Sequence, residues 1–115
     1  MAHDIRAQLR FLSISAQKVR LVVDLVRGKD AVKALEILRF TPQAAAQPVS
    51  KLLASAVANA EENFGVSRDD LFVAKIFADE APTRKWRRFG ARGRFKPILR
   101  RTSHVTVILR EHEAA

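Results

Sequence analysis

The sequence predicts an α+β fold, in which a three-stranded antiparallel sheet packs against three helices and a long β-hairpin arm extends beyond the sheet. Three observations lead to this prediction. Segments with the two-residue period of strands lie near both ends of the chain. Three segments with helical periodicity lie between them. A basic stretch separates the last two strands, and its midpoint carries two glycines suited to a turn.

The first predicted strand covers about residues 5–12. Apolar residues occupy every second position from Ile5 to Phe11, so one face of the strand is expected to be buried. Arg6 and Arg10 lie on the polar face. They are either solvated charges or a minor contact to a polyanion, and the pattern favours neither interpretation.

A first helix is predicted over about residues 16–27, with Ser15 as its N-cap and Gly28 as a left-handed residue after its end. Four valines form an apolar stripe, and Leu21 and Leu25 widen it, which predicts a largely buried helix. The outward side is either a phosphate-binding site or a plain solvent face. Its cations are Lys18, Arg20, Arg27 and Lys29.

Two further helices are predicted in the middle of the chain. The second covers about residues 31–39, with Asp30 as its cap. The third covers about residues 42–63, because Thr41 and Pro42 form a strong start signal. Pro48 would then fall in its second turn. The Ala-rich stripe of this helix indicates scaffold.

The last two predicted strands cover about residues 71–79 and 101–110. The former carries apolar residues at both odd and even positions, including Phe72 and Phe77. This pattern predicts a central strand with both faces covered. The latter alternates strictly, which predicts one buried face.

The basic stretch between these strands, residues 84–101, holds nine cations and no carboxylate. The rest of the chain carries 12 basic and 12 acidic residues, so the formal net charge of +9 lies entirely within this stretch. Globular domains usually disperse their charges. This concentration therefore predicts a polyanionic partner.

The other residues of the stretch point to nucleic acid. Trp86, Phe89 and Phe95 offer flat faces on which bases can stack. Gly90 and Gly93 permit a turn or a close approach of the main chain to phosphate. Arginine outnumbers lysine seven to two, and its planar group binds phosphate through two hydrogen bonds. The alternative is a disordered basic tail or a solvated face, but the flanking strands favour an arm.

The hairpin arm is predicted over about residues 80–102, within a single domain that covers residues 1–115. Ten residues a side would reach ~30 Å. A two-stranded ribbon has no core of its own, so the arm is predicted to be mobile when free and ordered by nucleic acid.

Composition and motifs predict no catalytic residue, metal site or cofactor. The chain has no Cys, which excludes disulfides and thiolate ligands, and His3, His104 and His112 have no metal-ligand spacing. Residues 90–93 match a G-x-x-G clamp, but strands flank them instead of helices, which indicates a turn. A signal peptide and a membrane-spanning run are also missing, so a cytoplasmic protein is predicted.

Several segments resemble the bacterial large-subunit ribosomal protein twenty-two family. They are Ile14-Ser15, residues 18–22, 37–42, 58–61, 91–94 and 101–107, in the order of the family. The resemblance implies an α+β domain on the large subunit, whose hairpin passes through 23S rRNA and lines the peptide exit tunnel. It also implies a role in subunit assembly, and contacts with neighbouring large-subunit ribosomal proteins and the nascent peptide.

The predicted RNA-binding residues fall into three groups. Phosphate contacts are expected from Arg84, Lys85, Arg87, Arg88, Arg92, Arg94, Lys96, Arg100 and Arg101. Trp86, Phe89 and Phe95 are expected to stack, and the tip lies near residues 87–93, with Gly90 and Gly93. The resemblance adds Lys18, Arg20, Thr102, Ser103 and His104.

The chain departs from the family pattern at Ala16-Gln17, Phe89-Gly90 and Lys96-Pro97. The first departure removes a cation from a helix start, the second alters the tip, and the third removes one ladder hydrogen bond. Two other classes fit a basic arm. A DNA-bending architectural protein would need an exposed apolar helix face for self-association. An enzyme domain would need a cluster of catalytic groups.

Overall fold

The computed structural model describes residues 4–89 and 95–112, with side chains over 4–82 and 101–112. The helices and strands follow the order β1 (Ile5–Leu12), α1 (Ala16–Val26), α2 (Ala31–Arg39), α3 (Ala46–Phe64), η1 (Arg68–Asp70), β2 (Leu71–Phe89) and β3 (Phe95–Glu111). The three strands form one antiparallel sheet, and three α-helices accompany it. The predicted α+β class is therefore confirmed.

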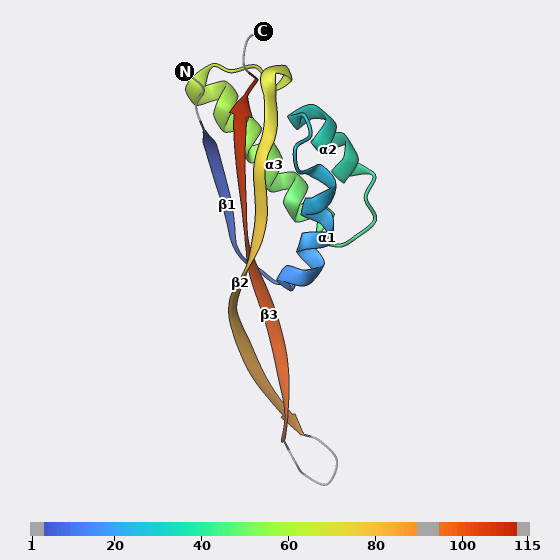
Figure 1. Ribbon diagram of the computed structural model, residues 1–115. Helices are drawn as coiled ribbons and strands as arrows, with labels where there is room; N and C mark the ends of the chain where they lie inside the picture. The colour runs from blue at the N-terminus through green and yellow to red at the C-terminus, as the bar shows by residue number, and fades with distance from the viewer. Residues whose placement is uncertain (1–3, 90–94, 113–115) are drawn as a thin grey trace.

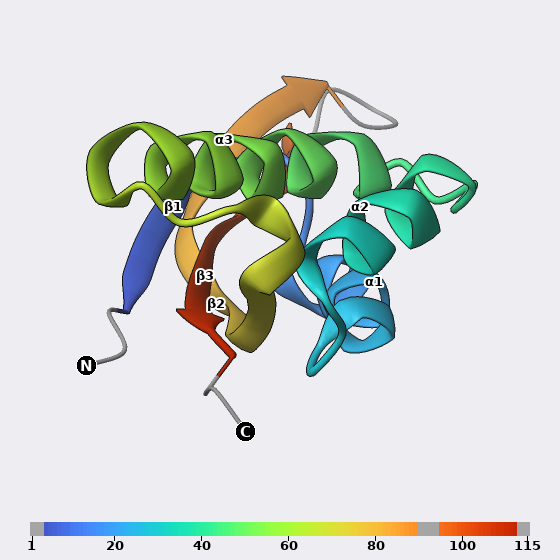
Figure 2. The ribbon, with the colours of Figure 1, turned by 90° about the horizontal axis from the view of Figure 1, so that it is seen from above.

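All three helices lie on one face of the sheet, as the view from above shows (Figure 2). The core fills the space between the two layers. Val105, Val107 and Leu109 of β3 point into it, and the valine stripe of α1 and the Leu53 side of α3 close it from the helical side. Alternation along the strands thus separates a core face from a helix-free face.

β3 is the central strand, because the strand order is β1-β3-β2. The prediction of a central strand over residues 71–79 was therefore wrong, since β2 is an edge strand. Its buried residues, such as Ile76 and Ala78, face the helices. Phe77 lies between them in sequence and is 37% exposed. The β2–β3 register shifts between Val73 and Lys75, so the core-facing residues change from odd positions (Leu71, Val73) to even ones (Ile76, Ala78). This bulge, together with Phe77 on the uncovered face, explains the apolar residues at both odd and even positions.

α1 confirms its predicted position but not its predicted burial. Its valines are fully buried, whereas Leu21 and Leu25 are 63% and 44% exposed. Ser15 occupies the N-cap position without a side-chain cap hydrogen bond. Gly28 follows the helix with φ at +78°, the left-handed conformation expected there.

α3 begins four residues later than the sequence signal predicted, and Pro48 explains the difference. A helix that began at Pro42 would place Pro48 where its ring clashes with the carbonyl one turn earlier. A start at Ala46 places Pro48 in the first turn, where no N–H is required. Thr41 caps the preceding helix instead, since its hydroxyl donates to the Ile37 carbonyl at 2.7 Å.

β2 and β3 continue past the sheet as a two-stranded arm (Figure 1). The ladder is interrupted by a register shift between Ala81 and Arg84, next to Pro82. It then continues to the pair Phe89 and Phe95. The arm makes the molecule elongated, with extents of 69 × 25 × 19 Å. The predicted turn at Gly90 and Gly93 lies outside the described residues.

Candidate nucleic-acid interface

The backbone register of the arm places basic positions opposite basic positions, and aromatic positions opposite aromatic positions. The register pairs Arg84 with Arg100 and Arg88 with Lys96. Like charges directly opposite each other destabilise a ladder, so these positions oppose pairing unless an anion neutralises them. Aromatic positions meet at the pair Phe89 and Phe95, which favours pairing.

The remaining arm positions complete this register. Trp86 pairs with Ile98, Lys85 with Leu99, and Arg87 with Pro97. Pro97 has no N–H to donate to the ladder, as the sequence predicted. Arg92 and Arg94 lie outside the described residues. RNA contact by the arm residues stays a prediction.

Two predicted RNA contacts at the base of the arm are buried hydroxyls. The Thr102 hydroxyl donates to the Pro82 carbonyl at 3.0 Å, and the Ser103 hydroxyl donates to the Ile14 carbonyl at 2.8 Å. Both residues are less than 9% exposed. They attach the start of the arm to β2 and to the loop before α1.

His104 holds a bulge in the neighbouring strand. The Phe11 N–H donates to His104 Nδ1 at 3.0 Å, and the two rings meet edge to face with centroids 4.7 Å apart. Phe11 adopts φ of +56°, which is unusual for a residue with a side chain. The β1–β3 register shifts between Leu9 and Leu12. His104 is half-buried. Because Nδ1 accepts from the Phe11 N–H, any RNA contact of this ring would have to use Nε2.

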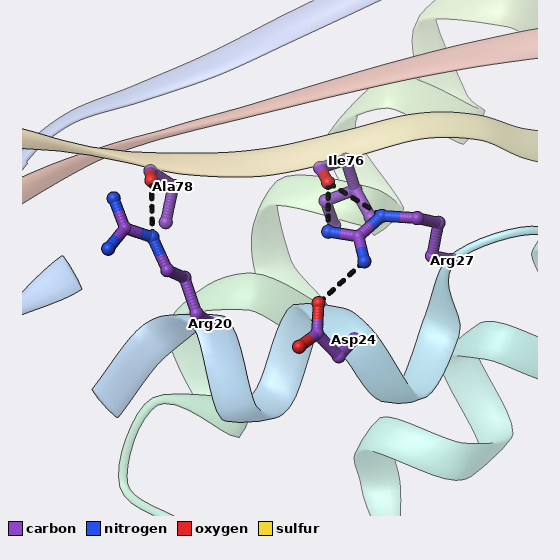
Figure 3. Close-up of polar contacts among 5 residues, drawn as sticks. All are labelled: Arg20, Asp24, Arg27, Ile76 and Ala78. Atoms are coloured by element: carbon purple, nitrogen blue, oxygen red, sulfur yellow. Dashed lines mark hydrogen bonds and ion pairs between the residues drawn. The ribbon is translucent and has the colours of Figure 1, made fainter. Parts of the chain in front are cut away.

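Arg20, a predicted RNA contact on α1, binds the edge of the sheet (Figure 3). Its Nε donates to the Ala78 carbonyl at 3.1 Å. Two helical turns further along, Arg27 donates to the Ile76 carbonyl through Nε and Nη2. Its Nη1 donates to Asp24 Oδ1 at 2.6 Å. The two arginines therefore satisfy carbonyls that an edge strand would otherwise leave unpaired.

Lys18 and Arg101 are exposed, as the prediction requires. The sequence left the role of Arg6 and Arg10 open. It gave no role to Lys75 and Phe77, which are exposed on β2, because residues 71–79 were assigned to a central strand with both faces covered. The seven-residue spacing of Arg20 and Arg27, two helical turns, could have indicated their shared role against β2.

One exposed ion pair joins the first and last strands. Arg110 Nε donates to Asp4 Oδ1 at 2.7 Å. This hydrogen bond holds the pKa of Asp4 below its ordinary value, with further help from the charges of Arg110 and Lys75. The same contact raises the pKa of Arg110.

Within residues 4–89 and 95–112, no three His, Cys, Asp or Glu side chains gather as a potential metal site. None of the helices in these ranges has the length and apolar content that a bilayer crossing requires.

The fold and the arm define a small α+β domain that carries a basic two-stranded extension. The sequence profile of the family described as ribosomal protein L22p/L17e matches residues 7–110. The chain therefore belongs to this family of ribosomal proteins, which confirms the resemblance seen in the sequence.

Individual relatives agree with the family match. The chain is 49% identical over 108 residues to the large ribosomal subunit protein uL22 of Pediococcus pentosaceus, covering 94% of this chain and 92% of the relative. It is 52% identical over 108 residues to the proteins of the same name from Thermoanaerobacter sp. strain X514 and Thermoanaerobacter pseudethanolicus, covering 94% of this chain and 97% of each relative.

Proposed function

We propose that this protein is a structural constituent of the large ribosomal subunit, without catalytic activity, and acts in the ribosome of the cytoplasm. Its globular part, residues 4–79 and 103–112, anchors the protein. The arm, about residues 80–102 of a single domain, binds 23S rRNA and lines the peptide exit tunnel. The observation that carries the proposal is the location of the whole net charge in one arm of a chain that belongs to a ribosomal family.

The arm suits a folded RNA better than a regular duplex. Its backbone ladder extends away from the helical layer, so both faces of the ribbon are free of protein elements (Figure 1). The like-charged pairs Arg84/Arg100 and Arg88/Lys96 occupy positions on one face of the ribbon, and Lys85 and Arg87 occupy positions on the other, so both faces require counter-anions. Densely folded RNA supplies phosphates in that arrangement, and it is recognised mainly through shape and backbone.

Binding across a salt series tests the RNA partner. We expect the wild type to prefer 23S rRNA fragments to duplex DNA at matched salt. A variant with Arg84, Lys85, Arg87 and Arg88 changed to Gln should lose about 3 from the slope of log K against log salt, because each phosphate contact contributes ~0.7 to 0.9.

The matched control changes four cations on the helical side of the molecule to Gln: Lys33, Arg39, Lys51 and Arg68. It removes the same charge from surfaces away from the arm, so its slope should stay close to that of the wild type. Equal slopes for the two quadruple variants would contradict an arm that binds phosphate.

Photo-crosslinking tests the position of the arm in the exit tunnel. A crosslinking residue at Phe89, in subunits that carry this protein, should capture a stalled nascent peptide. The same residue at Lys33 on α2 should not. Capture from both positions, or from neither, would contradict a tunnel-lining arm while leaving RNA binding intact.

A DNA-bending architectural protein is the second candidate, and one observation favours it. Leu21 and Leu25 form an exposed apolar pair one turn apart on α1, the kind of surface that such a protein needs for self-association. Light scattering on the free protein separates the two candidates. A dimer that binds duplex DNA as tightly as RNA would support the architectural protein, and a monomer that prefers RNA would exclude it.

A further inference from the structure

The face of the sheet opposite the helices carries a second surface with the chemistry of an RNA contact. We call it the helix-free face. It consists of Arg6, Gln8 and Arg10 of β1, Lys75 and Phe77 of β2, and Ile108 of β3. Figure 2 shows that no helix covers this side of the sheet.

The strand register brings these residues together. Arg6, Ile108 and Lys75 lie in one row across the three strands. Gln8 and Phe77 flank Thr106 in the next row. Neighbouring strands lie ~4.8 Å apart, so each row is ~10 Å wide. The Arg10 Nε donates to Gln8 Oε1 at 3.3 Å, which keeps the Arg10 side chain over the same face.

Phe77 is the residue that a merely solvated face does not explain. It is 37% exposed, although its sequence neighbours Ile76 and Ala78 are buried in the core. On a sheet face open to solvent, a polar residue at position 77 would expose no apolar area. An exposed ring on an open sheet face is the feature by which sheet-based RNA-binding modules stack bases.

The charges of this face favour an anionic partner. Arg6, Arg10 and Lys75 are all exposed. Among the carboxylates on this side of the sheet, Asp79 has no described ion pair, and it lies in the row of the register next to that of Phe77. Asp4, the other carboxylate on this side, is neutralised by Arg110 at 2.7 Å. The core of a protein interface is depleted of charged residues, whereas three of the six residues of this face are exposed cations.

The helix-free face is continuous with the arm. β2 and β3 form both regions, and the Thr102–Pro82 hydrogen bond joins the strands where one region becomes the other. Figure 1 shows the two strands passing from the sheet into the arm without another element between them. An RNA strand that leaves the base of the arm can therefore continue along the sheet.

We propose that the helix-free face binds a single-stranded segment of the RNA that the arm binds, with a base stacked on Phe77 and phosphates at Arg6, Arg10 and Lys75. The inference rests on the proposed function, because the arm and this face would share one RNA. It assigns a function to the two β1 arginines, whose role the sequence left open.

The test uses the full chain and 23S rRNA fragments across a salt series. A variant with R6Q, R10Q and K75Q should lose about 2 from the log–log salt slope, by ~0.7 per contact with a single strand. The control is K33Q, R39Q and K51Q on the helical layer, which should change the slope little. Circular dichroism and thermal unfolding verify that each variant is folded.

Phe77→Leu tests the stacked base separately. It keeps apolar bulk and removes the ring, so affinity should fall at least about fivefold with an unchanged salt slope. Phe40→Leu is the matched control, because Phe40 is exposed on the helical side of the molecule. Hydroxyl-radical footprints should show that the R6Q/R10Q/K75Q variant deprotects different nucleotides from the R84Q/K85Q/R87Q/R88Q variant.

The outcomes separate this inference from the proposed function. If the face variants bind like the wild type while the arm variant is weakened, the helix-free face is no RNA contact and the proposed function stands. If the arm variant also binds like the wild type, the proposed function fails. If the face variants bind RNA normally but do not enter subunits, the face contacts a protein and the inference is overturned.

Discussion

The same two strands build two very different regions of this molecule. From Leu71 to Ala81, β2 pairs with β3 beneath a layer of helices, and alternate residues are buried in the core. From Arg84 to Phe89, the ladder continues with two pairs of opposed cations and no helix against it. The ladder beneath the helices is stabilised by apolar burial within the chain, whereas the ladder of the arm has no such layer against it, and we expect an external anion to stabilise it. The hydrogen-bond pattern of a strand therefore does not reveal the source of its stability.

Amide hydrogen exchange on the free protein should show the largest difference between the two regions. Sheet amides open with free energies that approach the global value, whereas a ribbon without a core has little to protect it. We expect arm amides over residues 84–89 and 95–100 to exchange at least ~1,000-fold faster than those of β3 beside the core. Equal protection in the arm and in α3 would contradict an arm that is ordered by RNA.

A truncated side chain in the core should lower the stability of the region beneath the helices. Leu53→Ala in α3 removes a fully buried side chain and should lower the free energy of unfolding by about 3 kcal/mol in a urea titration. Leu21→Ala is the control, since Leu21 is largely exposed, and should change stability by less than about 0.5 kcal/mol. Similar losses for both variants would contradict the assignment of the core.

Ser103→Ala tests the junction between the regions. It leaves the Ile14 carbonyl without its buried donor and should cost about 1 kcal/mol of unfolding free energy. Ser55→Ala, at an exposed position of α3, should cost nothing. If Ser103→Ala weakens RNA binding at full stability, its hydroxyl contacts RNA and the structural role assigned to it is wrong.

Asp4→Asn should give the smallest effect, and it depends on pH. The folded-state pKa of Asp4 is lowered, mainly by the Arg110 hydrogen bond, so the ion pair stabilises the fold above the unfolded pKa of Asp4. That contribution disappears as pH falls through the lowered pKa. The melting temperatures of wild type and Asp4→Asn should therefore differ slightly at neutral pH and converge in acid. Glu36→Gln, on the exposed side of α2, should show no such convergence.

Sequence periodicity predicted the elements well where one local signal decided them. β1 and α2 begin and end at the predicted residues, because strict alternation and a clear helical stretch had no competitor. α3 was misplaced because two proline signals conflicted, and the steric demand of Pro48 outweighed the start signal at Pro42.

Tertiary arrangement was harder to predict from the sequence. Apolar residues at both odd and even positions of β2 matched a central strand, but they arise from a bulge between Val73 and Lys75 and from the exposed Phe77, in a strand that lies at the edge of the sheet. The sequence placed Arg20 and Arg27 on a helix side that was either phosphate-binding or solvated, and the resemblance made Arg20 an RNA contact, but both arginines donate to carbonyls more than 40 residues away in sequence. Of the candidate site, the basic arm was visible as charge, whereas the helix-free face depends on three strands that are distant in the chain.

The strand order also constrains when this protein can fold. β3 comes last in the chain and lies between the other two strands, so Ile5 finds its partner only when Leu109 is present. A growing chain can form its helices early, but it has no sheet for them to cover until the final strand is made. Loss of residues 104–112 would thus separate β1 from β2 and remove the sheet beneath the helices, instead of trimming one end. A prematurely terminated product would therefore leave the sheet-facing side of its buried valines exposed to solvent.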